Sequence, residues 1–260
     1  MKINIFHRLI TISLVFTFIF CISGCSDKDN EEPQNNPNTN QSPGVSATDF
    51  LSSENYDQLI VEIQYTTGFE PPQQAVSNLR SFLESILNKP SGISIVTTEI
   101  AAPGQSSYTI ADIQAIEDNN RTEFYEGKTI AAYFVLLDGG YSKDTGNSKV
   151  LGVAYRNTSM ALFQKTIEDH SGGLGQPSTS LLTSTVINHE FGHILGLVNN
   201  GTPLQTEHQD TAHGKHCNVE GCLMYWTAET NQGIADLLGM SAPPSLDAQC
   251  LADLKANGGK

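Results

Sequence analysis

The chain has 260 residues, which is enough for one large domain or two small ones. Hydrophobic residues make up 38% of it and charged residues 16%, so we expect a globular protein with a sizeable core. The formal net charge of −14 and the absence of a basic stripe argue against nucleic acid as a partner.

The N-terminal 24 residues have the pattern of a secretory signal. Lys2 and Arg8 precede an apolar run over residues 9–20, and small residues stand directly before Cys25. This ending resembles the bacterial lipobox, whose cysteine is lipidated and becomes the mature N-terminus. We therefore expect residues 1–24 to be a lipoprotein signal peptide and Cys25 to carry the lipid. A plain signal peptide or an uncleaved anchor is the alternative.

The next segment, residues 25–46, is predicted to be a tether. It consists almost entirely of polar residues and proline, so it has little to bury and is expected to be disordered and extended. Its acidic residues just after Cys25 resemble the export signal of surface lipoproteins in some Gram-negative bacteria. We expect a membrane-anchored protein of the bacterial cell envelope, attached to the outer membrane and facing the periplasm or the cell surface. Residues 47–260 follow as one folded domain.

The first half of this domain has the pattern of alternating strands and helices. Alternation and strand-forming residues predict strands over 57–66 and 93–100, with a helix over 75–87 between them. Residues 108–117 are ambiguous, with one helical turn as the favoured interpretation. The apolar segment 129–137 is predicted to be a central strand.

Two further segments precede the longest predicted helix. Residues 149–155 are predicted to form a strand, and 159–167 either a strand or a helix. Residues 152–155 suit an edge strand that pairs with an extended peptide, but a core strand is the simpler interpretation. The order of elements indicates an α/β (α+β) fold with a mixed twisted sheet.

A long helix is predicted from Ser178 to Gly196. Ser178 suits an N-cap, and Gly196 allows the chain to turn sharply out of the helix. Five apolar residues lie at helical spacing and are expected to pack into the core: Leu182, Val186, Phe191, Ile194 and Leu195.

This helix carries the strongest chemical signal in the chain. His189 and His193 are one turn apart on the same helix face, so both imidazoles can reach one metal ion. Glu190 lies beside them, where its carboxylate can take a proton from a water on the metal. Five of the seven histidines fall between residues 189 and 216. Although a buried helix with two incidental histidines has the same pattern, the clustering favours one catalytic Zn²⁺.

The last part of the chain is predicted to be loop-rich over 198–243, with a final helix over 245–256. It contains Cys217, Cys222 and Cys250. In an oxidising compartment, one disulfide and one free thiol is the simplest account of three cysteines, and a thiolate metal site is the competing use.

The helix motif and the loop that follows resemble the metzincin metallopeptidases. His189, Glu190, His193 and Gly196 are in register with the first part of the pattern H-E-x-x-H-x-x-G-x-x-H, but Asn199 stands where the family has its third histidine. The run from His216 through Cys217 and Cys222 to Met224 is similar to the archaemetzincin variant, His-Cys-x4-Cys-x-Met. The fourth and later cysteines of the archaemetzincin structural zinc site are not matched, since only Cys250 follows in this chain.

This resemblance implies a metzincin-like fold, with two long helices at a cleft between the sheet and an irregular C-terminal subdomain ending in a helix. It also implies that His216 is the third zinc ligand and that Met224 forms the methionine turn beneath the metal. His213, His208 and, as a poor ligand, Asn199 remain alternatives to His216. Asp210 is either a partner that orients one of these imidazoles or a surface charge.

The function predicted from these residues is a zinc-dependent metalloendopeptidase with peptide or protein substrates, acting by Glu-assisted attack of a water on the zinc. The alternative is a non-catalytic surface lipoprotein that binds a partner or glycan and has a closed structural zinc site. His208, His213, Cys217 and Cys222 are available as extra ligands for such a site. A third hypothesis, a thermolysin-like peptidase, requires Glu220 or Glu229 as third ligand.

Overall fold

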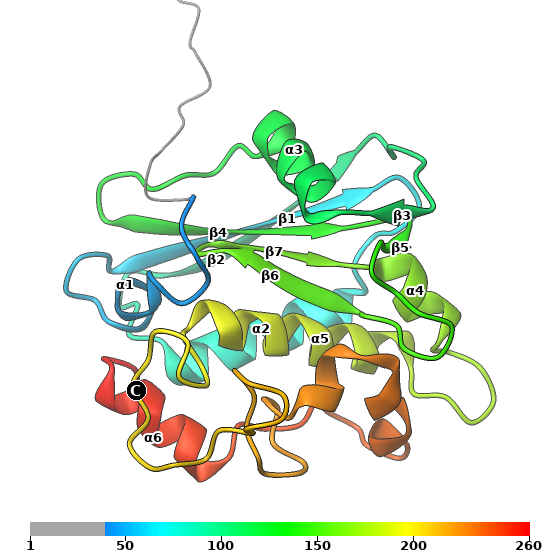
Figure 1. The fold of residues 1–260 in the computed structure, drawn as a ribbon. Helices are drawn as coiled ribbons and strands as arrows, with labels where there is room; N and C mark the ends of the chain where they lie inside the picture. Colours follow the sequence, from blue (N-terminus) through cyan, green and yellow to red (C-terminus); the bar gives the residue numbers. More distant parts are fainter. Residues whose placement is uncertain (1–39) are drawn as a thin grey trace, which may run out of the picture. The chain divides into compact units, whose positions relative to one another are not determined.

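The computed structural model describes residues 40–260. Its main element is a five-stranded sheet in the order β2-β1-β4-β7-β6, in which only β6 runs antiparallel to its neighbour (Figure 1). The strands are β1 (Gln58–Thr66), β2 (Gly92–Ile100), β4 (Thr129–Leu136), β6 (Gly152–Arg156) and β7 (Ser159–Leu162). A second, two-stranded sheet pairs β3 (Ser107–Tyr108) with β5 (Gly140–Tyr141). The mixed sheet and the central position of the strand predicted over 129–137 are both confirmed.

Helices cover both faces of this sheet. The two long helices, α2 (Gln73–Ile86) and α5 (Thr179–Ile194), lie on one face, and α3 (Ile110–Asn120) lies on the other (Figure 1). Beyond α5, on the side away from the sheet, the chain is mostly irregular. The remaining helices are α1 (Ala47–Leu51), α4 (Gln164–Asp169), the 3-10 helices η2 (Trp226–Glu229) and η3 (Asn231–Leu237), and α6 (Ala248–Ala256).

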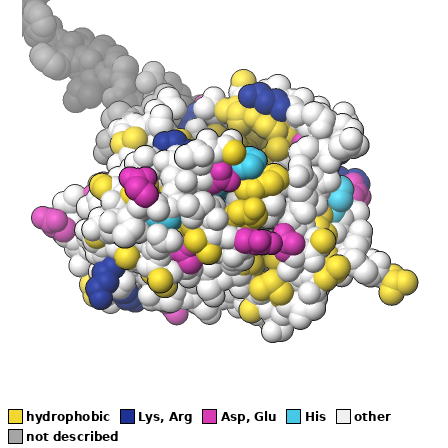
Figure 2. All heavy atoms as spheres, turned by 60° about the horizontal axis from the view of Figure 1, so that its bottom comes forward, with side chains coloured by type: hydrophobic (Ala, Val, Ile, Leu, Met, Phe, Trp, Pro, Cys, Tyr) yellow, Lys and Arg dark blue, Asp and Glu magenta, His cyan; other side chains and the backbone are white. Residues whose placement is uncertain are grey.

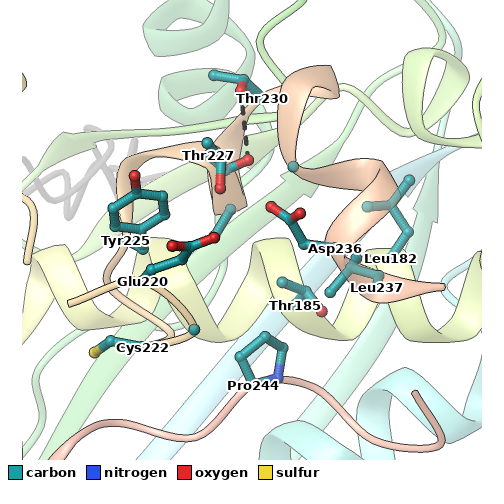
Figure 3. Close-up of a pocket in the computed structure, with 13 residues that line it drawn as sticks. Leu182, Thr185, Glu220, Cys222, Tyr225, Thr227, Thr230, Asp236, Leu237 and Pro244 are labelled. Atoms are coloured by element: carbon teal, nitrogen blue, oxygen red, sulfur yellow. Dashed lines mark hydrogen bonds between the residues drawn. The ribbon is translucent and has the colours of Figure 1, made fainter. Parts of the chain in front are cut away.

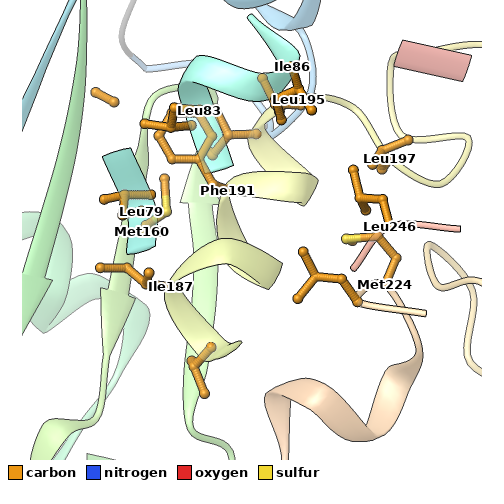
Figure 4. Close-up of a cluster of buried hydrophobic side chains, with 14 of the residues drawn as sticks. Leu79, Leu83, Ile86, Met160, Ile187, Phe191, Leu195, Leu197, Met224 and Leu246 are labelled. Atoms are coloured by element: carbon orange, nitrogen blue, oxygen red, sulfur yellow. The ribbon is translucent and has the colours of Figure 1, made fainter. Parts of the chain in front are cut away.

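The core explains why α5 is fixed in place. Towards the sheet, α5 packs against α2 and β4; the rings of Phe191 and Phe134 are 5.7 Å apart between centroids. Towards the C-terminal part it contacts the segment that contains Met224 and Leu246 (Figure 4). Residues 181–194 are all buried, as expected for a helix that is covered on every side.

The prediction that residues 152–155 form a core strand is wrong. β6 is the last strand of the sheet, and among the described residues it pairs only with β7. Strand order depends on long-range pairing, which local alternation does not determine. The ambiguous segment 159–167 contains both predicted structures, because β7 ends at Leu162 and α4 begins at Gln164.

Contacts with the folded domain begin earlier than residue 47. Gln41 donates from its backbone amide to Asn157 Oδ1 at 3.1 Å and accepts from the Asn157 amide at 2.8 Å. The predicted signal peptide, Cys25 and most of the predicted tether lie outside the described residues. Within residues 40–260, no helix has both the length and the apolar character needed to cross a membrane.

Candidate functional site

The predicted long helix forms and positions the first two candidate ligands. Ser178 is its N-cap and accepts a hydrogen bond from the Leu181 amide at 3.2 Å. After the helix, Gly196 has φ +79°, a left-handed conformation that favours glycine and turns the chain away. His189 and His193 therefore stand on a rigid, buried element, one turn apart.

His216 lies beside them and comes from the loop between α5 and η2. The Nε2 atoms of His189 and His193 are 3.1 Å apart. The His216 ring centroid lies 5.2 Å from that of His189 and 5.0 Å from that of His193. On the face shown in Figure 2, histidine side chains reach the surface beside hydrophobic and acidic side chains.

All three imidazoles are oriented in the same way. Each Nδ1 donates a hydrogen bond to a backbone carbonyl, which fixes the tautomer and leaves the Nε2 lone pair free for a metal ion. The acceptors are Leu223 O at 2.7 Å for His189, Leu197 O at 3.2 Å for His193 and His213 O at 2.6 Å for His216. Burial, followed by the charge of His189, lowers the pKa of His193 to about 3, so this ring is neutral at physiological pH, as metal binding requires.

A fourth donor, Glu229 at the end of η2, completes the group. Its carboxylate oxygens lie 3.7 Å from His189 Nε2, 3.8 Å from His193 Nε2 and 3.5 Å from His216 Nε2. A tetrahedral zinc ion with bonds of about 2.0–2.1 Å needs ligand atoms about 3.3–3.4 Å apart. The four residues therefore fit a zinc ion. The sequence marks Glu229 only as an available acid in a loop, and no local pattern indicates that it lies at this centre.

Glu190 is fully buried next to this group. Neither of its carboxylate oxygens has a hydrogen-bond partner of good geometry among residues 40–260, although the Ala154 amide on β6 lies near enough to oppose part of the pKa shift. Burial, followed by the charge of Glu229, raises the pKa of Glu190 well above its ordinary value. A buried carboxylate without a partner destabilises the fold, so its retention points to a chemical use.

Two glycines near the histidines, Gly152 and Gly192, leave no room for a larger side chain. A Cβ atom at Gly152 on β6 would lie 2.7 Å from Glu190 Oε1, and one at Gly192 would lie 2.2 Å from Met224 Sδ. Met224 is buried, and its carbonyl accepts from the Cys217 amide at 2.7 Å. It thus packs directly against the helix turn that carries the two histidines, where a methionine turn is expected.

The other residues weighed as a third ligand lie elsewhere. Asn199 donates to Gln209 Oε1 at 3.2 Å. His213 is exposed, pairs with Asp210 at 2.7 Å and stacks on Trp226 with 4.2 Å between ring centroids. Asp210 therefore orients His213 rather than a residue of the centre.

His208 belongs to a second buried group, with Cys217, Cys222 and Cys250. The expectation of a disulfide is wrong, because all three cysteines are free. His208 Nδ1 lies 3.4 Å from Cys217 Sγ and 4.0 Å from Cys250 Sγ, and the Cys222 and Cys250 sulfurs are 3.7 Å apart. The donor atoms of His208, Cys217, Asp247 and Cys250 all lie within 4.8 Å of one another, and Cys222 adjoins them through Cys250. Zn–S bonds of about 2.3 Å place ligand atoms about 3.6–3.8 Å apart, so an imidazole and thiolates at these spacings suit a zinc ion.

The surroundings of this second group also suit a metal. His208 Nε2 is held by buried Asp253 at 2.8 Å, which leaves Nδ1 to face the sulfurs. The amides of Met224 and Asp247 each donate to Cys222 Sγ at 3.4 Å. The Asp247 carboxylate also lies 3.1 Å from Cys217 Sγ. The sequence offered His208 and the three cysteines as possible ligands, but only the fold shows that His208 and Cys250 lie close to Cys217 and Cys222.

A cavity of about 310 Å³ is lined by α5 and by residues between Glu220 and Pro244, and its lining does not include the three histidines, Glu190 or Glu229. It is lined by Thr185, one turn before His189, and by Ala228 and Thr230, which flank Glu229. Glu220 and Asp236 point into it from opposite sides (Figure 3). Of the residues that the structure describes, no lysine, arginine or histidine lines it.

Comparisons with known proteins concern the fold. No protein-family model matches the sequence, and no curated protein matches it. The structure is similar to that of archaemetzincin from Methanopyrus kandleri, with a TM-score of 0.48 and 15% identity, covering 78% of this chain and 96% of that chain. It is also similar to metalloproteinase-II from Bacteroides fragilis, with a TM-score of 0.44 and 16% identity, covering 86% of this chain and 58% of that chain. The roles of the residues rest on their geometry.

Proposed function

We propose that the chain is a zinc-dependent metalloendopeptidase. His189, His193 and His216 would hold the ion, and Glu190 would act as general base. When bound, zinc supplies Lewis acidity that polarises the scissile carbonyl and acidifies a water molecule. Glu190 accepts the proton of the attacking water and transfers it to the leaving amine, which its raised pKa favours.

The observation that carries this proposal is the unpartnered carboxylate of Glu190 beside three converging imidazoles. A closed structural zinc site has no need of a buried base, and the residue would then only destabilise the fold. The competing function, a non-catalytic lipoprotein with a structural zinc, leaves Glu190 without a role.

The edge strand β6 suggests how a peptide binds. Its second side has no strand partner among residues 40–260, and its Gly152 and Ala154 lie against Glu190. An extended peptide that adds to such an edge gains main-chain hydrogen bonds and places one peptide bond at the base. The adjoining cavity would then receive one substrate side chain. Its acidic lining favours a basic side chain over an acidic one.

We assign a structural role to the second group. One zinc ion held by His208, Cys217, Cys222 and Cys250 would have four protein ligands and no open position. Because Cys217 directly follows His216, this ion would brace the loop that brings His216 to the first site.

The proposed location of the enzyme is a bacterial membrane surface, through a lipid on Cys25. Metabolic labelling with a palmitate analogue tests this: the full chain is expected to incorporate it and the Cys25→Ala variant is not. Equal labelling of both would contradict the assignment.

The test of the enzymatic function is cleavage of a denatured-protein or peptide library by zinc-reconstituted protein. Glu190→Gln keeps the size of the side chain and removes the base, so turnover should fall by about 10²–10⁴-fold with zinc content unchanged. Chelation should abolish cleavage, and added zinc should restore it. Zinc binding without any cleavage would favour the non-catalytic alternative.

A further inference from the structure

We infer that Glu229 is a fourth protein ligand of the resting centre, and that an incoming oxygen ligand must displace it. This inference rests on the proposed function, because a peptide substrate needs the coordination position that Glu229 would occupy. Its physical basis is the placement of the Glu229 carboxylate at 3.5–3.8 Å from all three Nε2 atoms.

The two oxygens of this carboxylate share the contacts with the imidazoles: Oε2 lies 3.7 Å from His189 Nε2 and 3.8 Å from His193 Nε2, and Oε1 lies 3.5 Å from His216 Nε2. Three histidines provide three corners, and in an open catalytic site the fourth corner belongs to water. Here a charged oxygen is within reach of that corner. Within residues 40–260, the buried His216 Nε2 has the Glu229 carboxylate at 3.5 Å and no hydrogen-bond partner of good geometry. An ion placed among these atoms would satisfy the imidazole and the carboxylate together.

The four donors differ in how firmly they are held. Each histidine is buried and fixed by a hydrogen bond from its Nδ1 to a backbone carbonyl. The Glu229 side chain is 26% exposed, and among residues 40–260 it forms ion pairs with the three imidazoles alone. It is therefore the ligand that can leave by rotation about its own side-chain bonds.

The backbone of Glu229 keeps the carboxylate close after it leaves. Its carbonyl accepts from the Leu151 amide at 2.8 Å, immediately before β6. The residue just before the strand that is proposed to bind substrate is thus hydrogen-bonded to the residue that is inferred to close the metal position. Glu190 and Glu229 have separate roles: the buried carboxylate is the base, and the partly exposed one is the displaceable ligand.

The experiment uses acetohydroxamate, a small chelator whose oxygens compete for the fourth position. Zinc-loaded full-length wild type, Glu229→Gln and Glu229→Ala are compared, with Glu99→Gln as a control that removes one exposed charge on β2, away from the site. Hydroxamate affinity is expected to rise about tenfold in both Glu229 variants and zinc affinity to fall by at least as much, with the control unchanged. Circular dichroism verifies folding, and the conservative Gln variant is available if the Ala variant is unstable.

Equal affinities for hydroxamate and zinc in all four proteins would overturn the inference. Peptide hydrolysis measures the proposed function independently, so a failure of the inference can be told apart from a failure of the proposed function. If the Glu229 variants retain zinc but lose cleavage that the wild type shows, Glu229 acts in catalysis and the inference fails. If none of the proteins cleaves peptides and the affinities still change as expected, the ligand assignment stands and the peptidase proposal fails.

Discussion

Replacing Gly152 by alanine tests whether β6 and the base are packed as described. The added methyl carbon would lie 2.6 Å from Val186 Cγ1 and 2.7 Å from Glu190 Oε1. Ordinary carbon contacts are about 3.5–4.0 Å, so the methyl carbon would overlap by about 1 Å with two side chains that are one turn apart on α5. Such overpacking is expected to cost about 1–3 kcal/mol of stability. A displacement of the base by about 1 Å is expected to lower kcat about 10²-fold.

The assay for Gly152→Ala combines thermal unfolding, zinc content and peptide hydrolysis. Zinc content should not change, because the three histidines are untouched. Gly146→Ala is the matched control, since nothing lies within 4 Å of a Cβ at that position. A Gly152→Ala protein as stable and as active as Gly146→Ala would refute the packing of β6 against Glu190. Loss of zinc from Gly152→Ala would contradict the view that moving Glu190 leaves the three histidine ligands in place.

Four further outcomes are expected. Cys250→Ser should lower the zinc content from two ions towards one and reduce the thermal midpoint, measured by elemental analysis and calorimetry; an unchanged content of one ion would contradict the second site. Met224→Ala should destabilise the fold by about 2–5 kcal/mol in denaturant unfolding, because it leaves a cavity beneath buried Gly192. Because Ala228 lines the cavity, Ala228→Trp should raise KM for peptides with bulky side chains and leave KM unchanged for peptides with small ones. Equal effects on both kinds of peptide would contradict a role of the cavity in substrate binding. Zinc affinity should fall as the pH drops, because protons compete with zinc for the His216 imidazole. Burial lowers the pKa of His216, but the hydrogen bond and charge of the Glu229 carboxylate outweigh burial, so the pKa is raised and protons compete at a higher pH than for an ordinary imidazole. A titration at constant ionic strength in which zinc affinity does not change with pH would contradict this.

The features that could be predicted from the sequence are local in the chain. Ser178 as N-cap, the histidines one turn apart and the turn at Gly196 depend on residues within a few positions of each other. Their geometry follows from helix spacing alone. The choice of His216 over His213 came from a family pattern, and the structure places His216 at the centre.

The features that could not be predicted depend on distant segments. Glu229 reaches the histidines because η2 folds back along α5, and no motif marks it. β6 lies at an edge because of the pairing order of five strands, which alternation does not encode. Three cysteines suggested a disulfide by their number, but His208 and Cys250 reach Cys217 and Cys222 only in the folded chain.

The most direct test of the central claim is anomalous diffraction at the zinc edge from crystals of the zinc-loaded protein. We expect one zinc within about 2.0–2.1 Å of the Nε2 atoms of His189, His193 and His216, with Glu190 outside the coordination sphere. A zinc ion that leaves His216 unbound, or that takes Glu190 as a ligand, would contradict the assignment of three histidine ligands and a separate base.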